Sequence, residues 1–178
     1  MTTPAPTWPA PAEPAGPAPG VLFAGHGARL GAYIIDAIIV GTVASVAMIA
    51  VALPLAGDLF RIALDDPDRL KVPATWAELG GQILAFIVGS LVIGLLAMLY
   101  FPFFWARGGA TPGMMAAGIR VVNDRDGSPI GWGPALLRLV GMWVSGAVFY
   151  LGFVWILVDS RRRGWHDLIA GTCVISTR

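Results

Sequence analysis

The sequence predicts an all-α integral membrane protein with two full transmembrane helices, a third membrane segment and a small cytoplasmic β-hairpin. Of its 178 residues, 56% are hydrophobic and 13% are charged, and the mean hydropathy is +0.72. Soluble domains carry roughly 25% charged residues, so this composition is typical of a membrane protein. Three apolar segments, about residues 31–55, 80–104 and 134–158, are each long enough to cross a hydrocarbon layer of about 30 Å as a helix.

Residues 1–20 are rich in proline and alanine. Such a segment cannot bury a hydrophobic core, which predicts a disordered tail in front of a membrane domain that spans residues 24–176.

The first apolar segment carries two charged residues, Arg29 at its start and Asp36 seven residues further on. Seven residues are close to two helical turns, so both side chains point to the same side of the helix. A carboxylate within the membrane costs on the order of 3 kcal/mol by insertion scales. We therefore expect Asp36 to face protein or water instead of lipid.

The second segment ends in a cluster of aromatic residues over 100–105, as helices do at a membrane interface. Ser90 and Gly94 form a small-xxx-small pair, which predicts a contact face for another helix.

The segment after the second span predicts a short helix and a β-hairpin. Thr111 followed by Pro112 is a helix-start signature, and the turn residues 123–127 predict a hairpin between 119–122 and a return strand at 128–130. Residues 172–177 also have the composition of a strand.

The third segment allows two interpretations. Arg138 lies inside it, and small residues at Gly141, Ser145 and Gly146 interrupt it. The Lys/Arg bias predicts that the amino terminus, residues 106–133 and residues 159–178 are cytoplasmic. One continuous span would place the basic residues 161–163 outside, whereas a bend near Ser145 and Gly146 would return them to the cytoplasm.

Several function classes lack support in the sequence. Cys173 is the single cysteine, so the chain has no intrachain disulfide, and no ligand spacing predicts a bound metal. No nucleophile–base pair or phosphate-binding loop is present, so we expect no enzyme activity and no cofactor. The net charge of +1, without interleaved basic and aromatic residues, predicts no nucleic-acid partner.

Three stretches in order, ARLGAYIIDAII, GGATPGMMAAGIRVVNDRDGSPIGWGPALLR and RRRGWHDLIAGTCVI, resemble the RDD family of small integral membrane proteins. The family is named for an arginine and two aspartates, which match Arg29, Asp36 and Asp167. Met114 departs from the lysine that many members carry after T-P-G. The resemblance implies a bacterial plasma membrane protein. Cation/proton exchange is suggested for some members of this mostly uncharacterised family, and scaffolding for others.

These observations predict a buried charge cluster formed by Arg29, Asp36, Arg138 and Asp167. Two interpretations of the cluster stay open. In the first, Asp36 carries a proton or cation in a small cation/proton or solute transporter that works as an oligomer. In the second, Asp36 pairs with Arg29 or Arg138 and fixes helix packing in a non-transporting scaffold or assembly factor, which binds other membrane proteins through its cytoplasmic β-hairpin and tail. In either case the expected partners are the lipid bilayer and either further copies of the chain or other membrane proteins.

Overall fold

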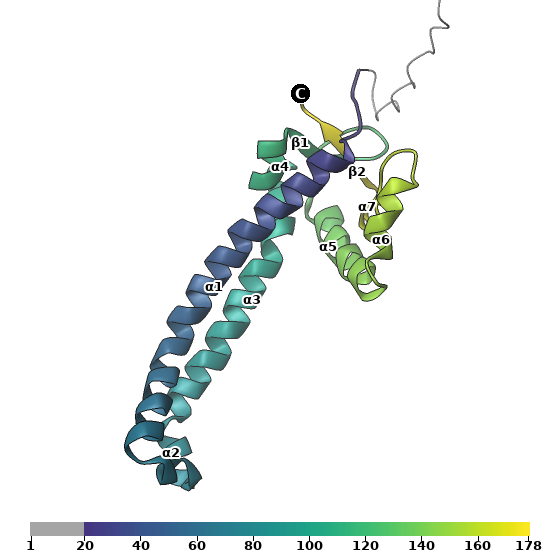
Figure 1. Cartoon of the computed structure of the whole chain (residues 1–178). Coiled ribbons are helices and arrows are strands. Elements are labelled where there is room, and N and C mark those ends of the chain that lie inside the picture. The colour runs from purple at the N-terminus through teal and green to yellow at the C-terminus, as the bar shows by residue number, and fades with distance from the viewer. Residues whose placement is uncertain (1–19) are drawn as a thin grey trace, which may run out of the picture.

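A computed structural model describes residues 20–178, so the predicted disordered tail lies outside the described residues apart from Gly20. Two long apolar helices, α1 (His26–Asp65) and α3 (Gly80–Gly108), run antiparallel and form a hairpin that projects from a smaller assembly of helices and strands (Figure 1). Both are long and apolar enough to cross a membrane. The predicted fold class is confirmed, with the two full spans inside α1 and α3.

At its far end, α1 continues as a helix beyond the apolar segment. A short 3₁₀-helix η1 (Pro67–Lys71) and α2 (Pro73–Glu78) connect it to α3, and each of these two elements begins with a proline, the favoured residue at a helix start. Exposed ion pairs join Arg69 to Glu78 and Lys71 to Asp68.

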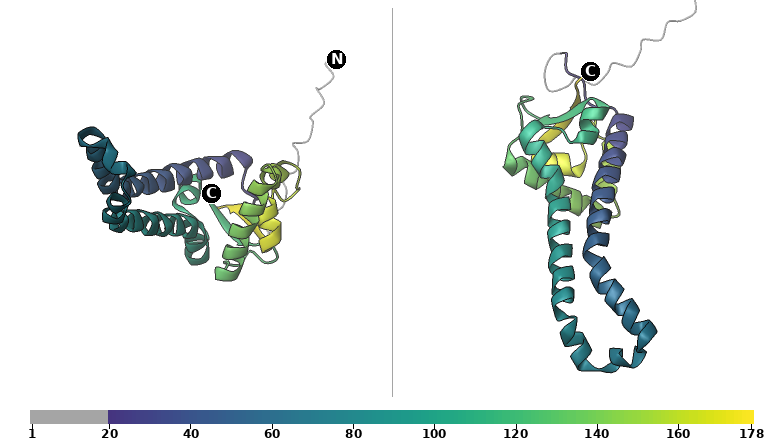
Figure 2. Two further views of the ribbon diagram at one scale, coloured as in Figure 1. Left: turned by 90° about the horizontal axis from the view of Figure 1, so that it is seen from below. Right: turned by 90° about the vertical axis from the view of Figure 1, so that its left-hand side faces the viewer.

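The remaining elements pack around the other end of the hairpin (Figure 2). We call residues 20–36 and 102–178 the head and the rest of α1–α3 the hairpin. The head contains α4 (Pro112–Ala117), β1 (Ile119–Asn123), α5 (Trp132–Ala147), α6 (Leu151–Val154), the 3₁₀-helix η2 (Trp155–Leu157), α7 (Trp165–Ala170) and β2 (Thr172–Ser176).

The predicted β-hairpin between residues 119–122 and 128–130 is wrong in its second strand. β1 pairs antiparallel with β2, with Val121 opposite Val174, and residues 128–130 form no strand. Asn123 N donates to Ser128 O and closes the turn, but the chain then continues into α5. Pairing with β2 buries both Val121 and Val174 completely, which an isolated surface hairpin could not do.

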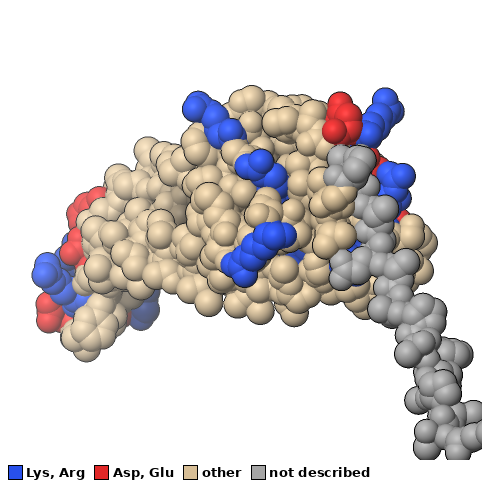
Figure 3. All heavy atoms as spheres, turned by 90° about the horizontal axis from the view of Figure 1, so that it is seen from above, with Lys and Arg blue, Asp and Glu red and all other residues tan. Residues whose placement is uncertain are grey.

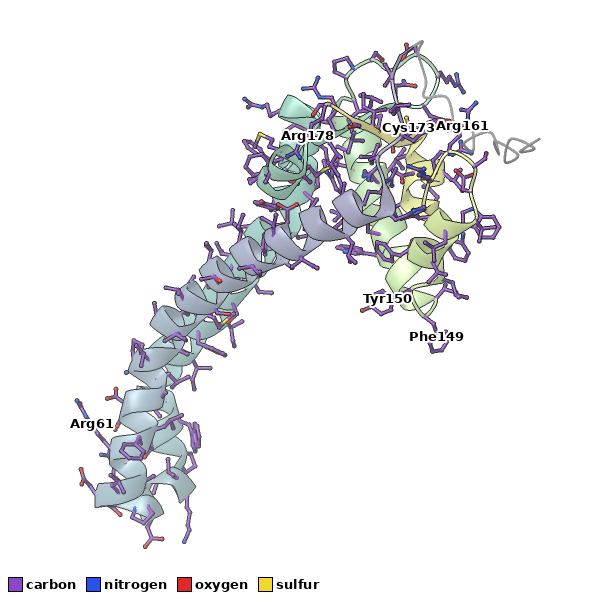
Figure 4. All side chains as sticks on the ribbon, turned by 45° about the horizontal axis from the view of Figure 1, so that its top comes forward. Arg61, Phe149, Tyr150, Arg161, Cys173 and Arg178 are labelled. Carbon is purple, nitrogen blue, oxygen red and sulfur yellow. The ribbon has the colours of Figure 1, made fainter. Side chains whose placement is uncertain are left out.

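The third membrane segment bends back on itself. α5 and the following helix pair α6–η2 meet at an angle of 111°. Between them, Phe149 and Tyr150 have positive φ values of 49° and 60° and lie at the exposed tip of the turn (Figure 4). The bend thus lies a few residues after Ser145 and Gly146, the position predicted from the sequence.

Close packing of small residues supports this bend. A Cβ atom on Gly152 would lie 2.6 Å from Ser145 Cβ, and one on Gly141 would lie 2.6 Å from His166 Cα. Larger residues at either glycine would force α6 or α7 away from α5. Ser145 Oγ donates 2.7 Å to Gly141 O, so its hydroxyl is satisfied within α5.

The sheet also joins the segment that leads into α1 to the carboxyl-terminal strand. Ala24 N donates 2.9 Å to Val174 O, and Phe23 bridges to Ile175, so the start of α1 is hydrogen-bonded to β2. β1, which is separated from the end of α3 only by the short helix α4, pairs with the same strand. The entry to α1, the exit from α3 and the carboxyl terminus therefore lie on one side of a membrane crossed by the hairpin.

The two residues of the predicted small-xxx-small pair differ in their surroundings: Ser90 Oγ lies 3.5 Å from Met48 Sδ of α1, whereas Gly94 is exposed. A Cβ atom on Gly94 would meet no atom within 4 Å, whereas one on Gly89 would lie 2.7 Å from Val51 Cγ1. The two spans thus approach each other at Gly89, and Gly94 faces outward.

Candidate arginine–aspartate site

Two buried carboxylates, Asp167 and Asp36, organise the head. Asp167 lies in the first turn of α7 and is fully buried. Arg29, from the first turns of α1, donates from Nη1 to Asp167 Oδ2 at 2.8 Å, and Arg138 from α5 donates from Nη1 to Asp167 Oδ1. Gly164 N donates to Oδ2 at 3.0 Å, as in a helix-capping arrangement. One carboxylate therefore joins α1, α5 and α7.

Two further groups hold the guanidinium of Arg138. Arg138 Nη1 also donates 2.9 Å to Thr172 Oγ1 at the start of β2, and its Cζ lies 4.7 Å from the centre of the Trp105 ring. A guanidinium over an indole face is a favourable cation–π contact, which ties the end of α3 to the same cluster. Arg29 and Arg138 are 4% and 1% exposed, so both charges are shielded from solvent.

The electrostatics of α7, which lies outside the two spans, follow from this geometry. Burial alone would raise the pKa of Asp167, but the charges of Arg138 and Arg29 outweigh it and hold the pKa below its usual range. Burial lowers the pKa of the neighbouring His166 to about 3, so this imidazole is neutral at pH 7. Its Nε2 lies 3.4 Å from Tyr33 Oη.

Asp36, two turns further along α1, has a separate set of partners. Its Oδ1 accepts hydrogen bonds from Tyr100 Oη and Gly113 N, both at 2.8 Å, and its Oδ2 accepts from Thr111 Oγ1 at 2.5 Å. The carboxylate is 1% exposed. It thus joins α1 to α3 and to the first turn of α4 through three neutral donors.

The predicted helix start at Thr111 explains part of this site. Thr111 Oγ1 accepts from Met114 N as the cap of α4, so its hydroxyl hydrogen is available for Asp36. Gly113 has no room for a side chain: a Cβ atom there would lie 2.8 Å from Asp36 Cγ and would collide with Ala32 O. The T-P-G sequence therefore combines a cap, a helix start and a close backbone approach to the carboxylate.

The structure brings three of the four predicted residues into direct contact. Arg29, Arg138 and Asp167 form one ion-paired group. Among residues 20–178, Asp36 makes no salt bridge, so the predicted pairing of Asp36 with Arg29 or Arg138 is corrected to hydrogen bonds from neutral groups. The reason is that both arginines reach toward α7, while Asp36 faces α4.

Sequence reasoning missed most of the supporting residues. Tyr100 and Trp105 were assigned to an interfacial aromatic belt, whereas Tyr100 donates to Asp36 and Trp105 stacks on Arg138. Its sequence context predicts Thr111 as a helix cap but not as a donor to a carboxylate 75 residues earlier in the chain. The burial of His166 could have been predicted from the sequence, because His166 directly precedes Asp167, which was itself expected to be buried.

The described residues contain no cluster of side chains suited to bind a metal ion. Across 20–178, no group of three or more His, Cys, Asp or Glu side chains could hold a metal ion. Cys173 is completely buried in β2, and burial raises the pKa of its thiol to about 12. The arginine–aspartate groups are therefore the candidate site.

Fold and site together define a small polytopic membrane protein with buried arginine–aspartate pairing in a head at one end of a helical hairpin. The profile of the RDD family matches residues 23–171, and the chain belongs to that family. The family match includes all four residues of the candidate cluster.

Two curated relatives are similar over about half of the chain. The uncharacterized protein YxaI of Bacillus subtilis is 30% identical over 93 residues, which cover 52% of this chain and 60% of that protein. A proline-rich antigen homolog of Mycobacterium tuberculosis is 27% identical over 97 residues, which cover 53% of this chain and 39% of that protein. The chain thus aligns with less than two thirds of either relative. No solved structure gives a significant match.

Proposed function

We propose that this protein is a membrane scaffold: the head is a rigid, ion-paired platform on one membrane face, and the hairpin is the surface on which other membrane helices assemble. The observation that carries this proposal is the composition of the hairpin beyond Asp36. Between Asp36 and Asp58, α1 has no Asp, Glu, Lys, Arg or His, and α3 has none of these residue types between its start at Gly80 and Arg107.

An ion pathway needs polar or ionisable groups through the whole hydrocarbon layer. Here the charged groups are confined to the head and to the far end of the hairpin, from Asp58 to Glu78. The third segment, the remaining candidate for a lining element, bends back by 111°. Within a single chain, Asp36 is therefore the only charged group along the spans that could bind an ion on its way through the hydrocarbon layer.

The hairpin is instead well suited to contact other helices. Neither of the most apolar stretches of α1 and α3 has a residue buried within the protein. An apolar groove of about 200 Å³ runs between the two helices and is lined by small and branched residues, among them Val43, Ala47, Leu96 and Ala97. Small residues let the backbone of a third helix approach closely.

The head is proposed to be cytoplasmic. Basic side chains are spread over it, as Figure 3 shows, and Arg107, Arg120 and Arg125 have no acidic partner within the described chain. The far loop between the spans carries the acidic residues 65, 66 and 68. Positive charge on short loops favours the cytoplasmic side.

Cross-linking in native membranes tests the scaffold. A photoreactive residue at Val43 or Leu96, in the groove, is expected to give a discrete protein adduct, either a dimer of this chain or a complex of fixed mass. The same residue at Arg61, at the far end in Figure 4, serves as a matched control and should give none. Absence of protein adducts at both groove positions would contradict the proposal.

Transport is a second candidate, favoured by one observation. Asp36 is a carboxylate buried within a membrane helix and hydrogen-bonded to a tyrosine, an arrangement that can exchange a proton. An oligomer would then have to supply the rest of the path. A sodium- or potassium-driven pH signal in proteoliposomes that is lost in Asp36→Asn would favour transport, and a flat signal under every gradient would favour the scaffold.

A further inference from the structure

The positive charge of the head exceeds its negative charge. Residues 20–36 and 102–178 contain nine arginines and five aspartates, with no lysine or glutamate. Four of these arginines form ion pairs with aspartates: Arg29, Arg138, Arg161 and Arg163. Arg107 and Arg120 are exposed and form no salt bridge with any described residue, so both cations can bind an anion from outside the chain.

These two arginines line one pocket on the surface of the head. The end of α3 contributes residues 106–109, β1 contributes residues 120–122, and Gly127 and Pro129 of the following turn complete it. None of the described residues that line the pocket is acidic. Its volume is about 270 Å³. Sites that enclose a whole ligand measure about 300–1,000 Å³, so this pocket suits a small charged group.

The neighbouring aromatic residues place this pocket at the level of the lipid headgroups. Phe103 and Trp132 are 43% and 47% exposed, and their ring centres lie 6.3 Å apart. Exposed aromatic rings at the end of a membrane helix lie at the interface between lipid and water. Arg107 follows Phe103 by about one helical turn, and its Cζ lies 5.5 Å from the centre of the Phe103 ring. The guanidinium therefore lies beside the interfacial aromatic residues, on the side of the head.

The chemistry of the pocket favours a phosphate group. A guanidinium presents its N–H donors in a planar fork that matches the geometry of phosphate oxygens. The carbonyl groups at the end of α3 carry partial negative charge, so the helix end itself does not attract an anion, and binding depends on the two arginines. Phosphate is the common anion of the headgroup layer, and anionic lipids attract basic side chains near the membrane surface.

We infer that the pocket between the end of α3 and β1 binds the phosphate of an anionic phospholipid, with Arg107 and Arg120 as its hydrogen-bond donors. The acyl chains of this lipid run past Phe103 and Trp132 toward the hairpin. The bound lipid fixes the depth of the head at the membrane surface. This inference is independent of whether the protein is a scaffold or a transporter.

Thermal melts of the full chain in an uncharged detergent, titrated with phosphatidylglycerol or phosphatidylcholine, test the site. Phosphatidylglycerol is expected to raise the melting temperature more than phosphatidylcholine, which has no net charge. Arg107→Gln and Arg120→Gln should each raise the phosphatidylglycerol concentration at half-maximal shift about fivefold, the effect of one basic residue near an anionic surface. Arg125→Gln is the matched control, because Arg125 is also exposed but does not line the pocket. It should change this concentration less than about twofold, since salt screens an exposed charge outside the site.

Three results would overturn the inference. An equal or absent shift with the two lipids would show no preference for an anionic headgroup. Equal responses of the three arginine variants would indicate a diffuse attraction of the basic surface. Inorganic phosphate, added without lipid at constant ionic strength, should leave the melting temperature unchanged, and a rise that is lost in Arg107→Gln would identify a soluble phosphate as the ligand.

Native mass spectrometry gives a second measurement, which does not depend on thermal stability. The protein extracted from membranes should retain bound phosphatidylglycerol, and Arg107→Gln and Arg120→Gln should retain less of it than Arg125→Gln. Equal retention by all three variants would also contradict the assigned site.

Discussion

The head and the hairpin are stabilised in different ways. In the hairpin, no residue from 37 to 74 and none from 80 to 101 is buried by the protein itself. In the head, two carboxylates and two guanidinium groups are almost completely buried, and apolar residues such as Val121, Val174 and Trp105 are buried beside them.

This difference indicates where each part obtains its free energy. The hairpin is held by transfer of apolar side chains into lipid, which fixes its place in the membrane but not its detailed packing. The head depends on particular hydrogen bonds and ion pairs, each of which has one geometry. Single substitutions should therefore have large effects in the head and small effects in the hairpin.

The largest effect is expected at Asp167. In Asp167→Asn, Arg29 and Arg138 keep their charges but lose their shared carboxylate, and an uncompensated buried charge costs roughly 3–5 kcal/mol. We expect loss of most folded protein, measured as the monodisperse fraction and the melting temperature in detergent. Asp68→Asn is the control, because the Asp68–Lys71 pair is exposed and worth at most about 1 kcal/mol. Equal melting of the two variants would contradict the assigned role of Asp167.

The second effect concerns the partner of Asp36. A hydrogen bond to a charged group contributes about 1.5–3 kcal/mol, so a double-mutant cycle of Asp36→Asn with Tyr100→Phe should show coupling of that order. The corresponding cycle with Arg29→Gln should show weaker coupling, since no direct bond joins Asp36 to Arg29. Stronger coupling to Arg29 than to Tyr100 would restore the ion pair expected from the sequence.

The third prediction is a pH dependence that belongs to the head. Burial lowers the pKa of His166 to about 3, below the value near 6.5 expected in the unfolded chain. Protons therefore bind preferentially to the unfolded chain between these values, and stability falls as the pH falls below about 6.5, by ~2 kcal/mol at pH 5. His166→Gln should flatten this slope in thermal melts at pH 5 to 7, with His26 retained in both proteins. A slope unchanged in the variant would assign the titration to another group.

The sequence predicted those parts of the fold that depend on local composition. The two spans, the start of α4 at Thr111 and the return of the third segment as one of two alternatives all follow from hydropathy, capping residues and small residues. Burial of Arg29, Arg138 and Asp167 was also predicted, because charged residues in apolar surroundings need partners.

The pairing of segments far apart in the chain could not be predicted as well from the sequence. The turn at 123–127 indicated a local hairpin, but β1 pairs with a strand about fifty residues later in the chain, since that partner closes the head around α5 and α7. The sequence predicts an arginine partner for Asp36, but the structure pairs it with neutral donors. The contacts of Asp36 with Tyr100 of α3 and with Gly113 of α4 could not be predicted from the periodicity of α1, because they depend on how distant segments pack.

The smallest effects are expected in the hairpin, where two glycines of α3 provide a matched pair. Alanine within a helix is favoured over glycine by roughly 0.5–1 kcal/mol. At Gly94, which faces open space, Gly94→Ala should therefore raise the melting temperature slightly. At Gly89 the added methyl group would lie 2.7 Å from Val51 Cγ1, and overpacking costs about 1–3 kcal/mol, so Gly89→Ala should lower it. Val51→Ala combined with Gly89→Ala removes the clash and should recover part of the loss. If both glycine variants changed stability in the same direction, the spans would not meet at Gly89, and the hairpin would be held by lipid or partner helices alone.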